Sequence, residues 1–199
     1  MIKVYQKLYE KTIFSIDSYT PSLIEYALKS GFTIVNDITG LANDEVAKIT
    51  AKYDATVVIM HMQGNPKDMQ NNPTYEDVMI DVDNFFKQRI QKAKDFGIEK
   101  IVLDVGIGFG KTLEHNLEIL NRLFEFRELG RPVLVGPSRK SFIGKITGDE
   151  PDKRQFGTAA SVAIAIKNGA DIVRVHDVKE MKQVVVIADA ISRNGAPPF

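Results

Sequence analysis

Short apolar runs and longer amphipathic stretches follow each other in a regular order along this chain. The apolar runs predict six strands, at residues 12–17, 33–38, 56–62, 100–104, 133–135 and 171–177. Between them, apolar residues recur at spacings of three and four, which predicts a helix after each strand. Near-continuous apolar strands that alternate with helices are typical of a parallel sheet covered on both faces.

Polar residues and glycines mark where several predicted helices begin and end. Thr20-Pro21 is expected to open the first helix, which Gly31 ends, and its inner side is expected to include Leu23. Asn43 is expected to cap the second helix, and Thr74 to open a capping box before the long one. Residues 2–9 are expected to be the end of a further helix.

An unbroken order of strands and helices fits two architectures. One is a doubly wound open sheet, and the other is a (β/α) barrel of the TIM type. In both, polar residues at the carboxyl ends of the strands line the binding site. With 199 residues, of which 44% are hydrophobic, the chain is long enough for one domain with a sizeable core, so we assign residues 1–199 to a single domain.

Composition and charge narrow the classes of function. The 26 basic and 26 acidic side chains balance, which argues against broad binding to nucleic acid or anionic membranes. The sequence has no cysteine, so it offers neither disulfides nor thiolate chemistry. Its apolar runs are too short to cross a bilayer, and the first residues lack the apolar core of a secretory signal. These features predict a cytoplasmic protein.

Residues 133–144 hold the most informative polar stretch. The apolar strand at 133–135 breaks at Gly136-Pro137, and Ser138-Arg139-Lys140-Ser141 then stands where a helix is expected to begin. Amide groups at a helix N-terminus attract anions, and neighbouring cations strengthen that attraction. The stretch therefore predicts an anion site, while a helix cap with two solvated cations is the alternative.

Other predicted strands also end in polar side chains. Asp17 closes the first predicted strand, and the dipeptide Asn36-Asp37 lies near the end of the second. A carboxylate and the Asn36 amide suit the edge of a planar heterocycle, with a cap or turn role as the alternative. Asp104 closes an apolar strand, so it should be partly desolvated and need partners. The glycines that follow Asp104 let their loop approach a ligand closely.

Arg174 and His176 alternate along the last predicted strand, so they are expected to face the same side. In a barrel mouth this cation and imidazole suit an anionic group, and a structural role is the alternative. His61 is expected to be structural. The three histidines, the third of which is His115, have no metal-ligand spacing, so we identify no metal ligand.

Gly110-Lys111-Thr112 resembles the end of a nucleotide-binding P-loop. Val105 stands where that motif needs its first glycine, however, and Lys111 also breaks the spacing of a dinucleotide-binding GxGxxG. The sequence therefore gives little support to a nucleotide site.

Taken together, six blocks of the chain resemble dihydropteroate synthase, of the pterin-binding TIM-barrel family. The blocks are Ser15-Ile16-Asp17, Val35-Asn36-Asp37-Ile38, Met60-His61, residues 103–112, Gly136-Pro137-Ser138-Arg139-Lys140-Ser141 and Arg174-Val175-His176-Asp177. The resemblance extends from about Ile13 onward. It implies a TIM barrel with about six of eight strand–helix units, so we expect the chain to lack the two N-terminal ones.

This resemblance implies a transferase of folate biosynthesis. Such an enzyme condenses 6-hydroxymethyl-7,8-dihydropterin pyrophosphate with p-aminobenzoate to give 7,8-dihydropteroate and pyrophosphate. Magnesium is the implied cofactor, although the family loop that binds it would lie in the units not found here. The expected partners are the two small-molecule substrates, and exposed sheet edges would allow a homodimer.

The resemblance also implies roles for individual residues. Catalytic roles fall on Asp104, Lys140 and Arg174. Pyrophosphate is expected at Arg174 and His176, and p-aminobenzoate at Phe109 and Ser141. The pterin is expected to contact Asp17, Asn36, Met60, Asp104, Gly136, Lys140 and Arg174.

Two other functions stay open at this point. One is a pterin-binding fragment without catalytic competence. The other is a pterin-dependent methyltransferase domain, against which the Ser138-Arg139-Lys140 and Arg174-Val175-His176-Asp177 blocks argue.

Overall fold

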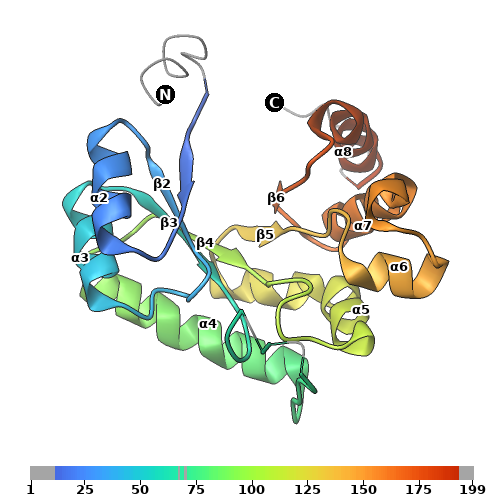
Figure 1. Cartoon of the computed structure of the whole chain (residues 1–199), viewed down its shortest axis with the longest axis horizontal. Coiled ribbons are helices and arrows are strands. Elements are labelled where there is room, and N and C mark those ends of the chain that lie inside the picture. Colours follow the sequence, from blue (N-terminus) through green and yellow to red (C-terminus); the bar gives the residue numbers. More distant parts are fainter. Residues whose placement is uncertain (1–11, 67, 70, 193–199) are drawn as a thin grey trace. The chain divides into compact units, whose positions relative to one another are not determined.

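The computed structural model describes residues 12–66, 68–69 and 71–192 (Figure 1). The helix end predicted at residues 2–9 lies outside them. In chain order, with η for a 3-10 helix, the elements are β1 Ser15–Asp17, α2 Pro21–Lys29, β2 Ile34–Asp37, α3 Asp44–Lys52, β3 Thr56–Met60, α4 Val78–Asp95, β4 Ile101–Asp104, α5 Leu113–Asn121, η1 Leu123–Leu129, β5 Val133–Val135, α6 Ser141–Thr147, η2 Pro151–Lys153, α7 Gln155–Lys167, β6 Ile172–Val173 and α8 Val178–Ser192.

The strands follow one another in the sheet in the order of the chain, from β1 to β6. β1 pairs with β2, β2 with β3 and β5 with β6, each in parallel. The chain thus has the α/β architecture that the sequence predicts, of the TIM-barrel type, with six strand–helix units in the part that the structure describes. The carboxyl ends of paired parallel strands share one edge, and Asp17 and Asn36 lie there as partners at the ends of β1 and β2.

The chain divides into two compact units, and the prediction of a single domain stays a prediction. The first unit covers residues 12–61 and 85–103 of the described chain. Its helix α3 begins as predicted, because the side chain of Asn43 accepts a hydrogen bond from the amide of Glu45. Helix α2 begins after Thr20 without a side-chain cap, and Leu23 is exposed although the apolar pattern placed it inside.

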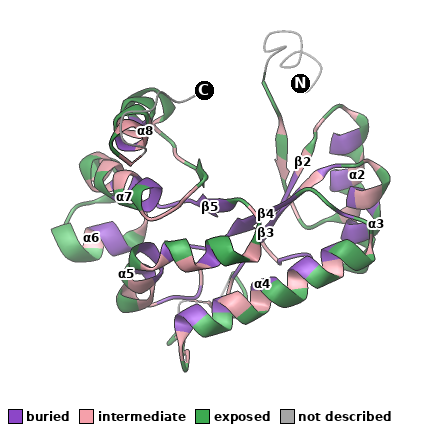
Figure 2. Ribbon diagram, turned by 180° about the vertical axis from the view of Figure 1, so that it is seen from behind, coloured by how far each residue is buried: buried purple, intermediate pink, exposed green. Residues whose placement is uncertain are grey.

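The second unit covers residues 62–84 and 104–192 of the described chain. Helix α7 packs against α5, α6 and α8. Val162 and Ile166 of α7 form a core with Met181 and Ala188 of α8. All three residues of β5 are buried, as Figure 2 shows in purple.

The prediction for the last strand was wrong in length. β6 spans Ile172–Val173 and not residues 171–177. Its partner β5 has three residues and is followed by Gly136-Pro137. The last hydrogen bond between the two strands is therefore the one from the Arg174 amide to the Val135 carbonyl, at 3.0 Å. Arg174 and His176 therefore belong to the segment after the strand, and strand alternation does not govern where they point.

The predicted capping box at Thr74 was also wrong. Helix α4 begins three residues later than that box requires, because Asp77 Oδ1 accepts the amides of Met79 and Ile80. The backbone of Thr74 is instead bound in both directions by the side-chain amide of Gln63.

Candidate active site

Asp17 and Asn36 are direct neighbours across the β1–β2 pair, in the first unit. Asp17 is exposed, whereas Asn36 is buried. Met60 ends β3 and is buried, two residues beyond Val58, the partner of Asn36. Because side chains alternate along a strand, Met60 lies on the same face as Val58. The structure therefore brings these three predicted pterin residues to neighbouring strand ends.

Asp37, beside Asn36, has a structural role. Its carboxylate accepts the amide and hydroxyl of Thr39 at 2.8 and 2.7 Å and the amide of Leu41 at 3.1 Å. These bonds hold the chain as it leaves β2. The turn role that was one alternative for this dipeptide thus applies to its second residue.

Asp104 is fully buried at the end of β4, where a carboxylate needs partners, and only one of its two oxygens accepts a hydrogen bond within the described part of the chain. Its Oδ1 accepts the amide of Gly106 at 2.9 Å. Its Oδ2 lies 2.7 Å from Arg174 Nη2, whose side chain is 43% exposed. A buried carboxylate is thus joined to a cation that reaches solvent.

Two glycines make room for the cations of this site. A Cβ atom on Gly136 would lie 3.0 Å from Arg174 Nη2, and one on Gly108 would lie 3.0 Å from the Lys140 side chain. Lys140 Nζ lies 4.0 Å from the centroid of the Phe109 ring, a cation–π distance. Burial lowers the pKa of Lys140, and the charge of Arg174 lowers it further, while Asp104 acts in the opposite direction. We call Asp104, Lys140 and Arg174 the charged cluster.

Lys111 is a buried cation, and in the sequence it stands out only as part of an incomplete nucleotide-binding motif. It is 2% exposed, and its Nζ donates to the carbonyls of Gly106 and Phe109, each at 3.1 Å. Burial lowers its pKa to about 7, with Asp104 acting in the opposite direction. The sequence signal for this buried lysine was the closely spaced glycines before it. Gly106 and Gly110 have φ of +65° and +60°, and Lys111 binds carbonyls of the loop that they shape.

The loop after β3 packs against this glycine-rich loop within the second unit. The hydroxyl of Tyr75 donates to the carbonyl of Gly110 at 2.6 Å. A Cβ atom on Gly110 would collide with the backbone of Gln63. The ring of His115 meets that of Tyr75 edge-on, 4.8 Å between centroids, and His115 also forms a capping box with Thr112. The backbone of Phe109 is therefore held by Lys111, and that of its neighbour Gly110 by Tyr75.

The segment after β6 completes the second unit's part of the site. Ser138 Oγ and His176 Nδ1 are 2.9 Å apart. Ser141 is the first residue of α6 and is exposed. His61 lies in the first unit, buried, with its ring edge-on to Phe85 at 4.9 Å between centroids.

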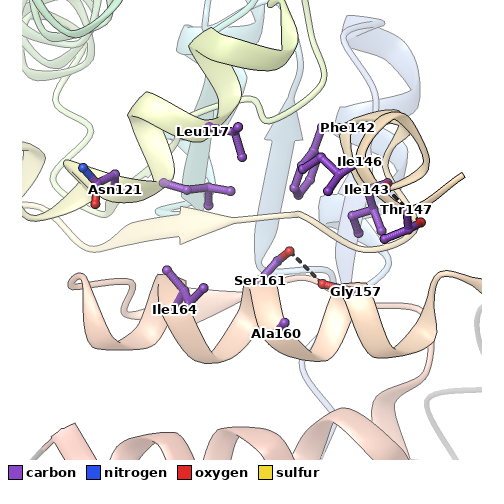
Figure 3. Close-up of a pocket in the computed structure, with 11 residues that line it drawn as sticks. Leu117, Asn121, Phe142, Ile143, Ile146, Thr147, Gly157, Ala160, Ser161 and Ile164 are labelled. Atoms are coloured by element: carbon purple, nitrogen blue, oxygen red, sulfur yellow. Dashed lines mark hydrogen bonds between the residues drawn. The ribbon is translucent and has the colours of Figure 1, made fainter.

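A separate apolar cavity of about 410 Å³ lies between α5, α6 and α7 (Figure 3). Leu117, Phe142 and Ile164 are among the residues that line it, one from each helix, and Ser161 turns its hydroxyl to the carbonyl of Gly157 there. None of the predicted site residues lines this cavity.

The described residues contain no group of three or more His, Asp or Glu side chains that could hold a metal ion. We therefore identify no metal ligand among these described residues and assign no step to a metal. No helix in the described part of the chain combines the length and the apolar character that a bilayer span requires.

Comparison with known proteins places the chain among pterin enzymes. Residues 1–176 match the family model described as pterin binding enzyme. A dihydropteroate synthase from Synechocystis sp. is 46% identical over 90% of this chain, and one from Escherichia coli is 43% identical over 88%. The matches cover 63% of each of those two proteins, so the chain spans less than two thirds of their length.

Solved structures give the same result. A Yersinia pestis dihydropteroate synthase with a sulfonamide drug superposes with a TM-score of 0.92 at 37% identity, over 97% of this chain and 72% of that one. Thermus thermophilus dihydropteroate synthase superposes at 38% identity over 92% of this chain. For its complex with 6HMPPP the TM-score is 0.88, and 74% of that chain is covered. For its complex with 4-aminobenzoate the TM-score is 0.89, and 72% of that chain is covered.

The family model covers residues 1–176, a range that includes Asp104, Lys140 and Arg174. On this evidence the chain belongs to the pterin binding enzyme family.

Proposed function

We propose that this chain carries the active site of a dihydropteroate synthase. In this proposal 6-hydroxymethyl-7,8-dihydropterin pyrophosphate is condensed with p-aminobenzoate, which gives 7,8-dihydropteroate and pyrophosphate. The observation that carries the proposal is the charged cluster, in which buried Asp104 is paired with Arg174 beside Lys140. The proposal is supported by the two relatives described above, which are dihydropteroate synthases.

The pterin ring is assigned to the polar strand ends and their neighbours. Asp104 is a buried acceptor that can take N–H groups from a heterocycle edge and balance positive charge on the ring. Lys140 is held by the Phe109 ring at a position where its ammonium can donate to a ring oxygen or nitrogen. The remaining pterin contacts in the proposal are Asp17, Asn36, Met60, Gly136 and Arg174.

The leaving pyrophosphate is assigned to Arg174 and His176. As the bond between the pterin methylene carbon and the pyrophosphate oxygen breaks, negative charge grows on that oxygen, and a guanidinium and ring N–H groups stabilise it. Arg174 reaches solvent on one side and Asp104 on the other, so it can contact both parts of the substrate.

The second substrate is assigned to Ser141 and Phe109. The carboxylate of p-aminobenzoate suits the hydroxyl of Ser141, which is the exposed first residue of α6. The neutral amine attacks the methylene carbon as pyrophosphate leaves, and it then loses a proton to solvent or to the leaving group. This chemistry needs neither a covalent enzyme intermediate nor a strong general base.

Three further expectations stay predictions. Magnesium is implied by the resemblance alone. A homodimer is testable by sedimentation velocity. A cytoplasmic location follows from the sequence features given above.

The proposal is tested by incubating the chain with both substrates and measuring 7,8-dihydropteroate. Lys140→Ala is expected to abolish product, whereas Glu125→Gln, in a half-buried ion pair with Arg122, is expected to leave it unchanged. Pterin binding without turnover would favour the non-catalytic fragment. Binding of methyltetrahydrofolate, with no dihydropteroate formed, would favour a methyltransferase domain.

A further inference from the structure

Two side-chain pairs join the loop after β5 to the segment after β6, both within the second unit. Ser138 Oγ lies 2.9 Å from His176 Nδ1 and also accepts the amide of His176 at 3.3 Å. At the next position of each segment, Arg139 donates to both carboxylate oxygens of Asp177, from Nη2 at 2.6 Å and from Nε at 3.2 Å. The two segments are therefore joined at consecutive residues.

Arg139 also has an unusual backbone. Its φ is +58°, in the left-handed region that long side chains rarely adopt. Its amide donates to the hydroxyl of fully buried Thr158 at 3.0 Å, and its carbonyl accepts from Arg154 Nη1 at 3.1 Å. Such a conformation persists only where the surroundings determine it, and it is concentrated at functional sites.

We call the Ser138–His176 and Arg139–Asp177 pairs the joint, and its position connects it to the proposed site. Lys140 follows Arg139 directly, and Ser141 then begins α6. Arg174 and His176 precede Asp177 on the other segment. A shift of the Arg139–Asp177 pair therefore changes the separation between the proposed pterin contact at Lys140 and the proposed pyrophosphate contacts.

We propose that Arg139 and Asp177 are positioning residues that set the affinity of the site for pterin pyrophosphate. They act by holding Lys140 in register with Arg174 and His176, and neither touches the substrate. The guanidinium fork is essential to this role, since a lysine ammonium cannot bind both carboxylate oxygens in one plane. The identity of the ligand rests on the proposed function, whereas the joint itself does not.

The test compares Asp177→Asn, Arg139→Gln and the double variant in the full chain. Calorimetric titration with pterin pyrophosphate is expected to show about tenfold weaker binding for each single variant, from the loss of charge-assisted hydrogen bonds that are partly exposed to solvent. The double variant is expected to bind no more weakly than either single one, because both remove the same interaction.

Glu125→Gln is the matched control. It removes a carboxylate from a second forked pair, in which Glu125 accepts from Arg122 at 2.7 and 2.9 Å, and its affinity should equal that of the unaltered chain. A purely structural role for Asp177 would lower the unfolding temperature and leave the affinity of the folded protein unchanged. Arg139→Lys keeps the charge but cannot donate to both oxygens of Asp177. If Asp177→Asn does not fold, the affinity of Arg139→Lys for pterin pyrophosphate is measured in its place.

Wild-type affinity in folded Asp177→Asn or Arg139→Lys would overturn the proposal, as would a double variant whose loss equals the product of the single losses. If the unaltered chain binds no pterin pyrophosphate, the proposed function fails. Amide hydrogen exchange then tests separately whether the Arg139–Asp177 pair holds the two segments together. Faster exchange at both 136–143 and 174–180 in Asp177→Asn supports it, and an unchanged rate in either segment overturns it.

Discussion

Replacing Lys111 with methionine tests whether burial of this lysine lowers its pKa in the folded protein. Lys111 is 2% exposed and its pKa is lowered by burial to about 7, from an ordinary value of 10.5. Between these two values the unfolded chain holds the proton and the folded chain does not. Because the unfolded state then binds more protons, the free energy of unfolding rises with pH in that range.

The size of the effect follows from the shift. Below pH 7 both states are protonated, and the full cost of burying the charge is present. As the pH rises toward 10.5 that cost disappears. Between pH 6 and pH 9 the unaltered chain should therefore gain about 3 kcal/mol of stability relative to Lys111→Met, which has no such titration. Loss of the bonds to the Gly106 and Phe109 carbonyls adds a penalty for the variant that does not vary with pH in this way.

Urea unfolding followed by circular dichroism at pH 6, 7, 8 and 9 measures this difference. Lys153→Met, which removes an exposed lysine of η2, controls for the general effect of a lost amine. A gap between the unaltered chain and Lys111→Met that stays constant from pH 6 to pH 9 would falsify the reasoning, because Lys111 would then be equally protonated in both states.

Three further changes are expected to weaken pterin pyrophosphate binding, as measured by calorimetry. Asp104→Asn removes the buried carboxylate from Arg174 and should cost at least about tenfold in affinity, so an unchanged value would count against the assigned ring contact. Arg174→Lys should also bind more weakly, since a point charge cannot replace a guanidinium, and equal affinity would remove the case for a forked contact. Gly136→Ala places a Cβ 3.0 Å from Arg174 Nη2 and should lower affinity by displacing that side chain, which wild-type binding would contradict.

Much of the fold could be predicted because local patterns determine it. β5 spans the predicted residues 133–135, and Asn43 caps α3 through its own side chain. The closeness of Asp17 and Asn36 also follows from the sequence, since both lie near the carboxyl ends of parallel strands that are consecutive in the chain. These features depend on residues near one another, or on a regular register.

The predictions from sequence fail where the local structure depends on residues that are distant in the chain. The apolar pattern through Val175 predicts a strand to residue 177, but the length of β6 is set by its three-residue partner. Arg139 and Asp177 are 38 residues apart, and neither carries a local signal of the fork that joins them. Lys111 looks like a P-loop lysine in sequence, and only positive φ values at the surrounding glycines turn carbonyls toward its ammonium.

The contact of Gly110 with the backbone of Gln63 has a consequence for how such barrels diversify. With no space for even a methyl group there, and with Tyr75 bonded to the same glycine, the two loops form one interlocking part. An insertion or graft in either loop alone would push Phe109 away from Lys140. Variation in this corner of the molecule is therefore expected to be inherited as a matched set of loops, and a designer who exchanges one should exchange both.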